Sequence, residues 1–435
     1  MTEHATGAQS WQQAGDGTRY HEHDVRMRAD DGGLLEIMHA TTDTGAMLRA
    51  RFAARCCMRG AVSRAEDLSG VWRFRELVMP TAGDAIVSHP EGNTPLLGRD
   101  RLRAFTGADG LLIKHEGHNP TGSFKDRGMT VGVTQAKRVG ARAVACASTG
   151  NTSASLASYA ANAGIPALVF VPDGQIALGK LTQTLAYGAR TLMVRGDFDR
   201  CLALVQEASA SLGIYLVNSI NPWRIEGQKT IVFELLEQLG WIAPDFLVLP
   251  AGNLGNTAAF GKALREARAL GLIDRVPRLV SVQAEGANPF FRGFADDFAT
   301  RHRVEAHTIA TAIKIGDPAS WDRAVQGIRE SDGLVLSVSD EEILAAKVVI
   351  DATGVGCEPA SAASVAGVRQ LVARGVVQPS HSVVAVLTGH VLKDPGILVQ
   401  YHQEREPAPP DANRPIVIDA TIRAVADVLD RVSAA

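Results

Sequence analysis

The chain has 435 residues, a size that predicts about two or three domains and a core large enough to fold without disulfides. Hydrophobic residues make up 46 % of the chain, and 44 lysines and arginines against 47 acidic residues give a net charge of −3, so neither a disordered chain nor a polyelectrolyte fits. No basic run or ladder of aromatic and basic residues occurs, so we expect no nucleic-acid partner. The 42 glycines and 5 % aromatic residues favour an α/β protein over a β-sandwich.

The number and spacing of the cysteines and the absence of long apolar runs indicate the cellular compartment of the protein. The five cysteines are odd in number and lack CxxC spacing, which argues against a disulfide framework and a zinc ribbon and favours a reducing compartment. The polar N-terminus lacks a signal-peptide pattern, and no apolar run approaches the ~18 residues that cross a bilayer. We therefore expect a cytoplasmic protein with no membrane partner. The run HEHD at 21–24 has no partners at ligand spacing, so we expect no metal.

The two ends of the chain differ from its middle in sequence pattern and composition. Residues 1–85 are predicted to form a separate N-terminal lobe, with an arginine-rich helical segment at 46–60. Near the other end, a proline-rich connector at 404–414 precedes residues 416–432, which are predicted to form a short strand and a terminal helix.

From about residue 110 onward, short apolar runs alternate with segments of helical period. The predicted buried strands are 111–115, 142–148, 166–172, 191–194, 214–219, 246–252, 279–286, 334–338 and 383–389. The predicted helices, several of which end in glycine, are 126–140, 152–164, 198–213, 226–240, 257–271 and 358–375. This alternation predicts an α/β fold of parallel sheets with helices on both faces, which binds ligands in the loops that follow the strands.

A lysine in the segment HNPTGSFKDRGMTVGV is the first candidate for chemistry. Lys125 lies between a Gly/Ser loop and a helix expected to begin near Asp126. An electropositive helix N-terminus lowers the pKa of a lysine toward the neutral amine that attacks a carbonyl. Lys125 therefore suits a Schiff base, and a solvated lysine in a first helical turn is the alternative.

Two loops between a strand and a helix are candidate anion sites. In ASTGNTSAS, the residues Ser148, Thr149, Asn151 and Thr152 offer hydroxyl and amide groups beside free backbone N–H groups; an ordinary N-cap loop is the alternative. In LPAGNLGN, glycines allow backbone amides to approach a phosphate at a helix N-terminus; any tight turn could use them equally. The residues of this second loop are Gly252, Asn253, Leu254, Gly255 and Asn256. With Lys125 and a late VLTGH turn, the loops predict a cofactor that carries an aldehyde and a phosphate.

Six motifs, in order between residues 120 and 395, resemble those of the threonine synthase family, pyridoxal-phosphate enzymes of fold type II. They are PTGSFKDRGM, ASTGNTSAS, NSINPWRIEGQKT, LPAGNLGN, EPASAASVAG and LTGHVLKDP. The resemblance implies a tryptophan synthase β-like fold, with two parallel-sheet domains, the cofactor in the cleft between them, and a homodimer. The implied parts are an N-terminal lobe (1–85), a large domain (86–119 and 224–405), a small domain (120–223) and a C-terminal connector and helix (406–435).

The resemblance also implies residue roles. Lys125 would hold pyridoxal phosphate covalently and move protons at the substrate carbons. Asn151 would bind the cofactor's 3′-oxygen, the backbone from Gly252 to Asn256 its phosphate, and Thr388 its ring nitrogen. A hydroxyl at that nitrogen would leave it largely neutral and the ring a weaker electron sink. The implied substrate ligands are Ser148, Thr149 and Thr152, chiefly for the carboxylate, and Asn218, Ser219 and Arg224 for a phosphate.

The reaction implied converts O-phospho-L-homoserine and water to L-threonine and phosphate, by γ-elimination and β-addition of water, as the last step of threonine biosynthesis. A threonine or serine dehydratase is one alternative, but it has no substrate phosphate to hold. A cysteate-synthase-like paralogue is a second alternative, since it takes a phosphorylated amino acid. A non-catalytic ligand-binding relative is a third, and retention of Lys125 argues against it.

Two departures from the family pattern concern the N-terminal lobe and a late loop. The lobe resembles a degenerate zinc-ribbon-like start, because Arg28 and Asp31 stand where the family's thiols would fall. Val391 follows His390 where the family usually has glycine. Neither departure changes Lys125 or the predicted phosphate contacts.

Overall fold

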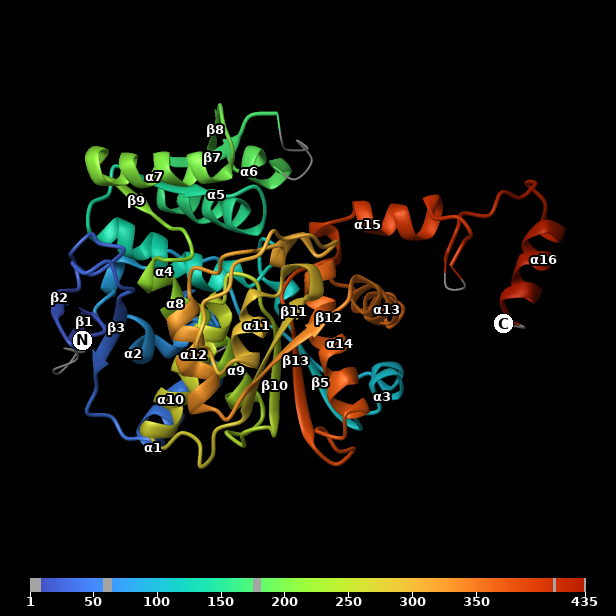
Figure 1. Ribbon diagram of the computed structural model, residues 1–435, viewed down its shortest axis with the longest axis horizontal. Helices are drawn as coiled ribbons and strands as arrows, with labels where there is room; N and C mark the ends of the chain where they lie inside the picture. The colour runs from blue at the N-terminus through green and yellow to red at the C-terminus, as the bar shows by residue number, and fades with distance from the viewer. Residues whose placement is uncertain (1–8, 58–64, 175–180, 410–411, 434–435) are drawn as a thin grey trace. The chain divides into compact units, whose positions relative to one another are not determined.

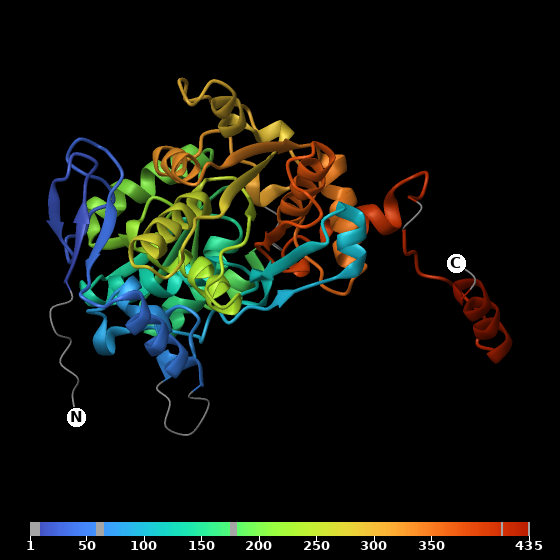
Figure 2. The same ribbon diagram turned by 90° about the horizontal axis from the view of Figure 1, so that it is seen from below.

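A computed structural model describes residues 9–57, 65–174, 181–409 and 412–433. The chain through Asp394 forms one compact unit, and the chain from Pro395 onward forms a second. Figures 1 and 2 show two parallel sheets with helices in the first unit. None of the helices in the described ranges is long and apolar enough to cross a membrane.

The larger sheet has six strands in the order β12–β11–β10–β13–β5–β4. Its strands are β4 (Leu96–Leu97), β5 (Gly110–His115), β10 (Phe246–Pro250), β11 (Arg278–Ala284), β12 (Leu334–Val338) and β13 (Ser382–Leu387). All neighbours are parallel except β4, which runs antiparallel to β5 with Leu96 opposite Lys114. The carboxyl ends of the parallel strands therefore meet at one edge, where such sheets bind ligands.

Helices cover both faces of this sheet because alternate strand residues point to opposite sides. Leu247 and Leu249 of β10 belong to a core shared with helices α9, α10 and α12, whereas Phe246 and Val248 belong to a core shared with α3, α13 and α14. These helices are α3 (Asp100–Thr106), α9 (Thr230–Gln238), α10 (Gly255–Ala269), α12 (Trp321–Glu330), α13 (Asp340–Asp351) and α14 (Pro359–Ala373).

The smaller sheet has four parallel strands in the order β8–β7–β6–β9, also between helices (Figure 1). Its strands are β6 (Ala143–Ala147), β7 (Ala167–Pro172), β8 (Arg190–Val194) and β9 (Ile214–Leu216). Val144 and Cys146 of β6 pack with α4 and α5, whereas Ala145 packs on the side of α7. The helices around it are α4 (Lys125–Arg138), α5 (Asn151–Ala163), α6 (Thr182–Ala186) and α7 (Phe198–Leu212).

The nine predicted strands and the parallel sheets covered on both faces are confirmed, with corrections to burial and to helix bounds. The run at 191–194 is not buried: β8 is an edge strand, and Leu192 and Met193 are 39 % and 56 % exposed. The helix predicted at 226–240 is two helices, α8 (Pro222–Gln228) and α9. The Thr230 hydroxyl takes the Gly227 carbonyl that a continuous helix would use, at 2.6 Å.

Residues 9–40 hold three antiparallel strands that were not predicted. They are β1 (Gln9–Gln13), β2 (Arg19–His21) and β3 (Glu36–Ala40), in the order β2–β1–β3. The predicted helix at 46–60 is α1 (Gly45–Cys57), and residues 58–60 lie outside the described residues. The short helices α2 (Arg75–Val78) and α11 (Pro289–Ala295) complete the first unit's α-helices in the described ranges.

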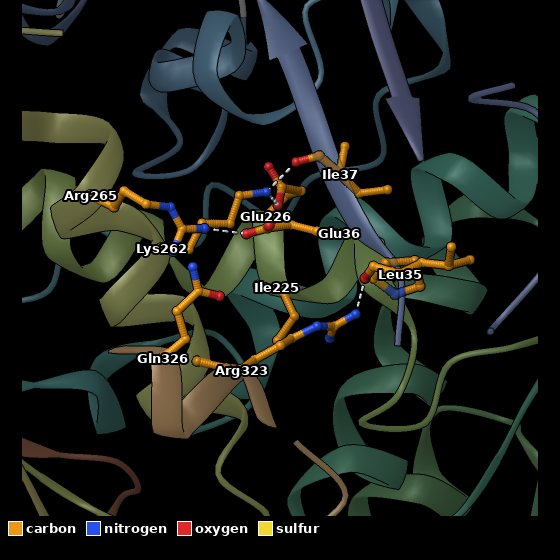
Figure 3. A pocket seen from close by; sticks show the side chains of 11 residues that line it. Leu35, Glu36, Ile37, Ile225, Glu226, Lys262, Arg265, Arg323 and Gln326 are labelled. Carbon is orange, nitrogen blue, oxygen red and sulfur yellow. Dashed lines mark hydrogen bonds and ion pairs between the residues drawn. The ribbon is translucent and has the colours of Figure 1, made fainter. Parts of the chain in front are cut away.

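Buried and partly buried charges fasten the N-terminal sheet to the helices of the larger sheet (Figure 3). Lys262 of α10 donates to the Ile37 carbonyl of β3 and to the Glu226 carboxylate of α8. His39 Nε2 lies 2.7 Å from the same carboxylate, and Arg265 pairs with Glu36 at 2.5 Å. The N-terminal sheet is therefore held by specific ion pairs as well as by apolar packing.

The second unit contains α15 (Gly396–Val399) and α16 (Ile422–Ser433). The terminal helix is confirmed, but the strand predicted before it is wrong, because residues 416–419 pair with no strand in the described chain. Val417 is 97 % exposed, and an unpaired apolar run gains nothing from an extended conformation.

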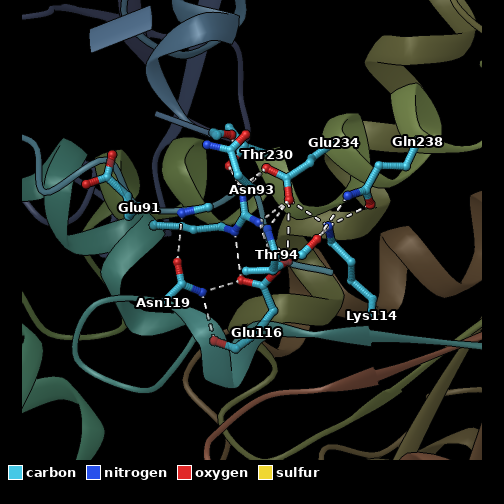
Figure 4. Close-up of polar contacts among 12 residues, drawn as sticks. Glu91, Asn93, Thr94, Lys114, Glu116, Asn119, Thr230, Glu234 and Gln238 are labelled. Carbon is cyan, nitrogen blue, oxygen red and sulfur yellow. Dashed lines mark hydrogen bonds and ion pairs between the residues drawn. The ribbon is translucent and has the colours of Figure 1, made fainter. Parts of the chain in front are cut away.

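A fully buried charge network lies beneath the start of α4 (Figure 4). Arg127 donates to Glu116 at 2.7 Å and to Glu234 at 2.8 Å, and Lys114 pairs with Glu234 at 2.6 Å. Glu234 also accepts from the backbone N–H groups of residues 93 and 94, at 2.8 and 2.9 Å. Burying these charges is tolerable only because each of them has partners.

We expect Glu234→Gln to lower the free energy of unfolding by at least about 3 kcal/mol, because it leaves Lys114 and Arg127 buried without full compensation. Urea denaturation followed by circular dichroism measures this change. The control is Asp100→Asn, which alters an ion pair with Arg103 whose carboxylate is 99 % exposed. Equal stability of the Glu234→Gln variant and the control would contradict the prediction.

Candidate active site

Lys125 is the first residue of α4, and the loop that precedes it is fastened to the end of β13. The Phe124 N–H donates to the Thr388 carbonyl at 3.0 Å, and Ser123 forms a β-bridge with Gly389. On the other side, the Asp126 carboxylate accepts from the Thr121 and Ser155 hydroxyls, both at 2.6 Å. The backbone that carries the lysine is thus held between β13 and α5.

The amine of Lys125 has an environment that favours its neutral form. Its pKa is lowered to about 7, as the sequence predicts in direction. Burial is the largest cause, and the Arg224 guanidinium adds to it, whereas the Glu358 carboxylate opposes it. The sequence argument invoked the helix N-terminus instead. A lysine whose pKa is near 7 can supply a free amine to a carbonyl at neutral pH.

Arg224 lies in the first turn of α8, where Asn221 caps the helix and Pro222 is its first residue. Its side chain is only 1 % exposed, and Nη1 donates to the Val217 carbonyl at 3.0 Å. Nε and Nη2 are buried and find no hydrogen-bond partner among the described residues. Burial lowers the pKa of Arg224 to about 10. Two unpaired N–H donors on a buried cation are costly unless an anion occupies them.

The loop from β10 to α10 presents a helix N-terminus that no side chain caps. Leu254 adopts a left-handed conformation, with φ +62°. A side chain at Gly252 would be too close to the backbone of Ile313, because its Cβ would lie 2.9 Å from the Ile313 Cα. Asn253 uses its side chain internally: it donates to Ser219 at 3.1 Å and accepts from the Ala319 N–H at 2.9 Å. Asn253 can therefore offer a ligand its backbone N–H, and the loop fits a phosphate dianion.

The loop after β6 carries the remaining predicted contacts and leads into α5 at Asn151. The Ser148 hydroxyl accepts from the Gly150 N–H at 3.3 Å, whereas the Thr149 and Thr152 hydroxyls have no hydrogen bond within the described chain. The Asn218 amide is bonded to both backbone groups of residue 147, at 3.1 and 3.2 Å. This pair holds the NSINPWR segment beside the loop, and it occupies the Asn218 side chain.

Glu358 belongs to the same site but was not assigned from sequence. It is 4 % exposed, accepts from Asn151 Nδ2 at 2.9 Å and accepts from the Thr388 hydroxyl at 3.3 Å. Burial raises the pKa of its carboxyl group, against the Asn151 hydrogen bond and the charges of Lys393 and Lys125. The available signal was a single carboxylate at the start of a helix of small residues, EPASAAS.

Hydrogen bonds link the segments that carry the predicted site residues. Hydrogen bonds join the LPAGNLGN loop to Ser219, the NSINPWR segment to the end of β6, and Asn151 through Glu358 to Thr388. The Phe124 N–H donates to the Thr388 carbonyl and so links the loop before Lys125 to the end of β13. No group of three or more His, Cys, Asp or Glu in the described ranges is arranged to hold a metal.

Comparison with known proteins gives the class of this site. Residues 87–389 match the sequence model of a family described as "Pyridoxal-phosphate dependent enzyme". The threonine synthase of Methanosarcina acetivorans is 48 % identical to this chain, over 83 % of this chain and 87 % of the relative. The threonine synthase of Methanocaldococcus jannaschii is 42 % identical, over 89 % of this chain and 94 % of the relative. The chain is thus a pyridoxal-phosphate-dependent enzyme of fold type II, and within that class it belongs to the threonine synthase family.

Solved structures support the fold. Threonine synthase from Escherichia coli matches 97 % of this chain and 99 % of its own, with a TM-score of 0.68 at 18 % identity. Pyridoxal phosphate fits the residues described above: Lys125 offers an amine to its aldehyde, and the uncapped α10 N-terminus suits its phosphate.

We expect Arg224→Gln to raise the pKa of Lys125, because the variant lacks a positive charge that favours the neutral amine. Each unit of that rise cuts the neutral fraction at pH 7 by up to about tenfold. The measurement is the pH dependence of the rate at which apoprotein develops the absorbance band of bound pyridoxal phosphate. Its midpoint should move to higher pH in Arg224→Gln and stay in place in Arg190→Gln, a control at an exposed arginine of β8. An unmoved midpoint in Arg224→Gln would refute the proposed coupling.

Proposed function

We propose that this enzyme converts O-phospho-L-homoserine and water to L-threonine and phosphate. The observation that carries the proposal is Arg224, whose Nε and Nη2 are buried without a partner in the described chain and whose charge acts on Lys125. A substrate phosphate would pair with both donors. Serine or threonine, the substrates of a dehydratase, would leave them unpaired, which favours a phosphorylated substrate.

The proposed cofactor contacts are those that the family resemblance implies. When bound, pyridoxal phosphate supplies an electron sink for negative charge on the substrate carbons. The backbone from Gly252 to Asn256 holds its phosphate, Asn151 faces its 3′-oxygen, and Thr388 faces its ring nitrogen. Lys125 holds the cofactor until substrate arrives, and its amine then accepts the proton from Cα.

Two sets of residues are proposed to bind the two anionic groups of the substrate, its carboxylate and its phosphate. The carboxylate is bound by Ser148, Thr149 and Thr152, a role supported by the free hydroxyls of the two threonines. Arg224, with Ser219, holds the phosphate, whereas the Asn218 amide, predicted as a third ligand, positions their segment through its bonds to residue 147. Lys125 must release the Cα proton before its amine takes a proton from Cβ; the bond from Cγ to oxygen then breaks, and the phosphate leaves with the electron pair. Protons return to Cγ and to Cα, and water gives its hydroxyl to Cβ and its proton to the phosphate, so atoms and charge balance.

We further propose that residues 120–223 act as a small domain that closes on a large domain of residues 86–119 and 224–405. The four-stranded sheet, whose strands all fall within 120–223, supports this division. The N-terminal lobe would comprise residues 1–85 and the C-terminal connector and helix 406–435. Free cysteines at 56, 146, 201 and 357 are consistent with the reducing cytoplasm, and the family resemblance favours a homodimer.

Wild-type protein supplied with pyridoxal phosphate and O-phospho-L-homoserine should release phosphate and threonine in equal amounts. Lys125→Ala should release neither, because the variant lacks the amine that forms the covalent link and moves the protons. A coupled phosphate assay and amino-acid analysis measure the two products. Parallel reactions with O-phosphoserine, serine and threonine test the alternatives. Turnover of one of these, with O-phosphohomoserine inert, would overturn the substrate assignment.

For Arg224→Gln we expect kcat/KM with O-phospho-L-homoserine to fall by roughly 100-fold, because two charge-assisted hydrogen bonds to phosphate are lost. Assays run above the shifted pKa of Lys125 separate this loss from the effect on the amine. Arg190→Gln should match wild type. If Arg224→Gln keeps full kcat/KM at that pH, the substrate phosphate is bound elsewhere.

A further inference from the structure

A lysine in the loop after β13 bonds to a helix beside the smaller sheet, and the reaction above uses neither partner of this bond. Lys393 Nζ donates to Gln183 Oε1 of α6 at 2.5 Å, and both residues are partly buried. Gln183 Nε2 in turn donates to the Thr121 carbonyl at 3.3 Å. Gln183 therefore joins α6 to two loops, the loop after β13 and the loop that leads to Lys125.

Each partner of the bond is fixed to its own part of the fold. The methylene chain of Lys393 packs on the backbone of Gly122, where a Cβ would lie 3.4 Å from the lysine Cδ. The Gly122 carbonyl accepts from the His390 N–H at 2.9 Å, which holds this loop at the end of β13. Leu181, directly before α6, belongs to the core of α4, α5 and the smaller sheet. A movement of the smaller sheet away from the end of β13 would therefore break the bond between Lys393 and Gln183.

Two other hydrogen bonds between side chains link the loops of the two sheets around the site. They join Asn151 to Glu358 and Asn253 to Ser219. Each of them includes a residue that is proposed to bind cofactor or substrate, so a bound ligand competes for the same groups. The bond to α6 includes no such residue, and it can stay in place when the site is filled.

The chemistry of the bond to α6 is that of a contact that forms and breaks during turnover. A charged donor with a neutral acceptor makes a stronger hydrogen bond than two neutral groups do. Breaking it leaves one charge without its partner, whereas breaking an ion pair leaves two. The bond is thus strong enough to favour one arrangement and weak enough to open when product leaves.

We propose that Lys393, through its bond to Gln183, holds the small domain closed on bound substrate, an inference that rests on the domain division and the closure proposed above. Lys393 is a positioning residue here, because it acts on the substrate through the position of α6. Loss of the bond should speed the release of substrate and leave the chemical step unchanged, which raises KM at constant kcat.

Lys393 also acts through its charge, and this effect has to be separated from the bond. Burial raises the pKa of the Glu358 carboxyl group, and the charge of Lys393 opposes that rise. Gln183 carries no charge, so Gln183→Met removes the bond and leaves the lysine in place. It also covers a Lys393→Met protein that does not fold, since it breaks the same bond from the other side.

The first measurement is amide hydrogen exchange of the holoenzyme without substrate, followed by mass spectrometry of peptides that contain α6. We expect Lys393→Met and Gln183→Met each to raise the exchange rate of α6 by roughly tenfold, because each removes the same charge-assisted bond. The double variant should exchange no faster than either single variant. Lys137→Met and Gln206→Met, at exposed residues of α4 and α7, are matched controls and should exchange as wild type does. Wild-type exchange of α6 in Gln183→Met overturns the proposal.

The second measurement is steady-state kinetics with O-phospho-L-homoserine. Lys393→Met and Gln183→Met should each raise KM by roughly tenfold and keep kcat within about twofold of wild type. A lower kcat at unchanged KM overturns the proposal, and so does a KM that changes in Lys393→Met alone, since the lysine would then act only through its charge. A wild-type protein that is inert toward O-phosphohomoserine fails the function test instead. The comparison of KM and kcat then uses the substrate that the parallel reactions identify, and the exchange of α6 needs no substrate.

Discussion

One buried guanidinium joins the two sheets of this enzyme. Arg127 comes from α4, which packs on the four-stranded sheet, and binds Glu116 directly after β5 and Glu234 on α9, which packs on the six-stranded sheet. Removing three charges from water is costly, and the cost is offset only when all partners are in place. The network therefore specifies one relative position of the two sheets. It also fixes the start of α4, and hence Lys125, two residues before Arg127.

With the relative position of the two sheets fixed, residues at the carboxyl ends of parallel strands from both sheets form the site. Strand β6 leads to Asn151, β10 to the loop at the α10 N-terminus, and β13 to Thr388. Glu358 bonds to both Asn151 and Thr388, the two residues proposed to contact the cofactor ring. The site thus combines a lysine of lowered pKa, an uncapped helix end and a buried carboxylate, and the charges of Lys125 and Glu358 act on each other.

Family membership and local chemistry answer different questions about this protein. The relatives establish the class, because similarity extends over most of the chain and most of each relative. The argument for a phosphorylated substrate comes from Arg224, whose unpaired donors would be a defect in an enzyme for serine or threonine. Asn218 and Asn253 show the opposite case, since both side chains already have internal partners.

The sequence by itself determined the α/β class, the nine strands of the parallel sheets and the loops that lead to Lys125, Asn151 and Gly252 to Asn256, whereas Arg224 came from the family resemblance. These features depend on local pattern: apolar runs, helical period, and glycine or capping residues at strand ends. It did not predict the N-terminal antiparallel strands or the exposure of β8, because pairing and edge position depend on distant segments. Nor did it reveal Glu358, whose partner Asn151 lies 207 residues away. The proximity of Lys125 to Arg224, and thus the lysine's lowered pKa, was likewise decided by tertiary packing, because burial and charge act across space, independently of separation along the chain.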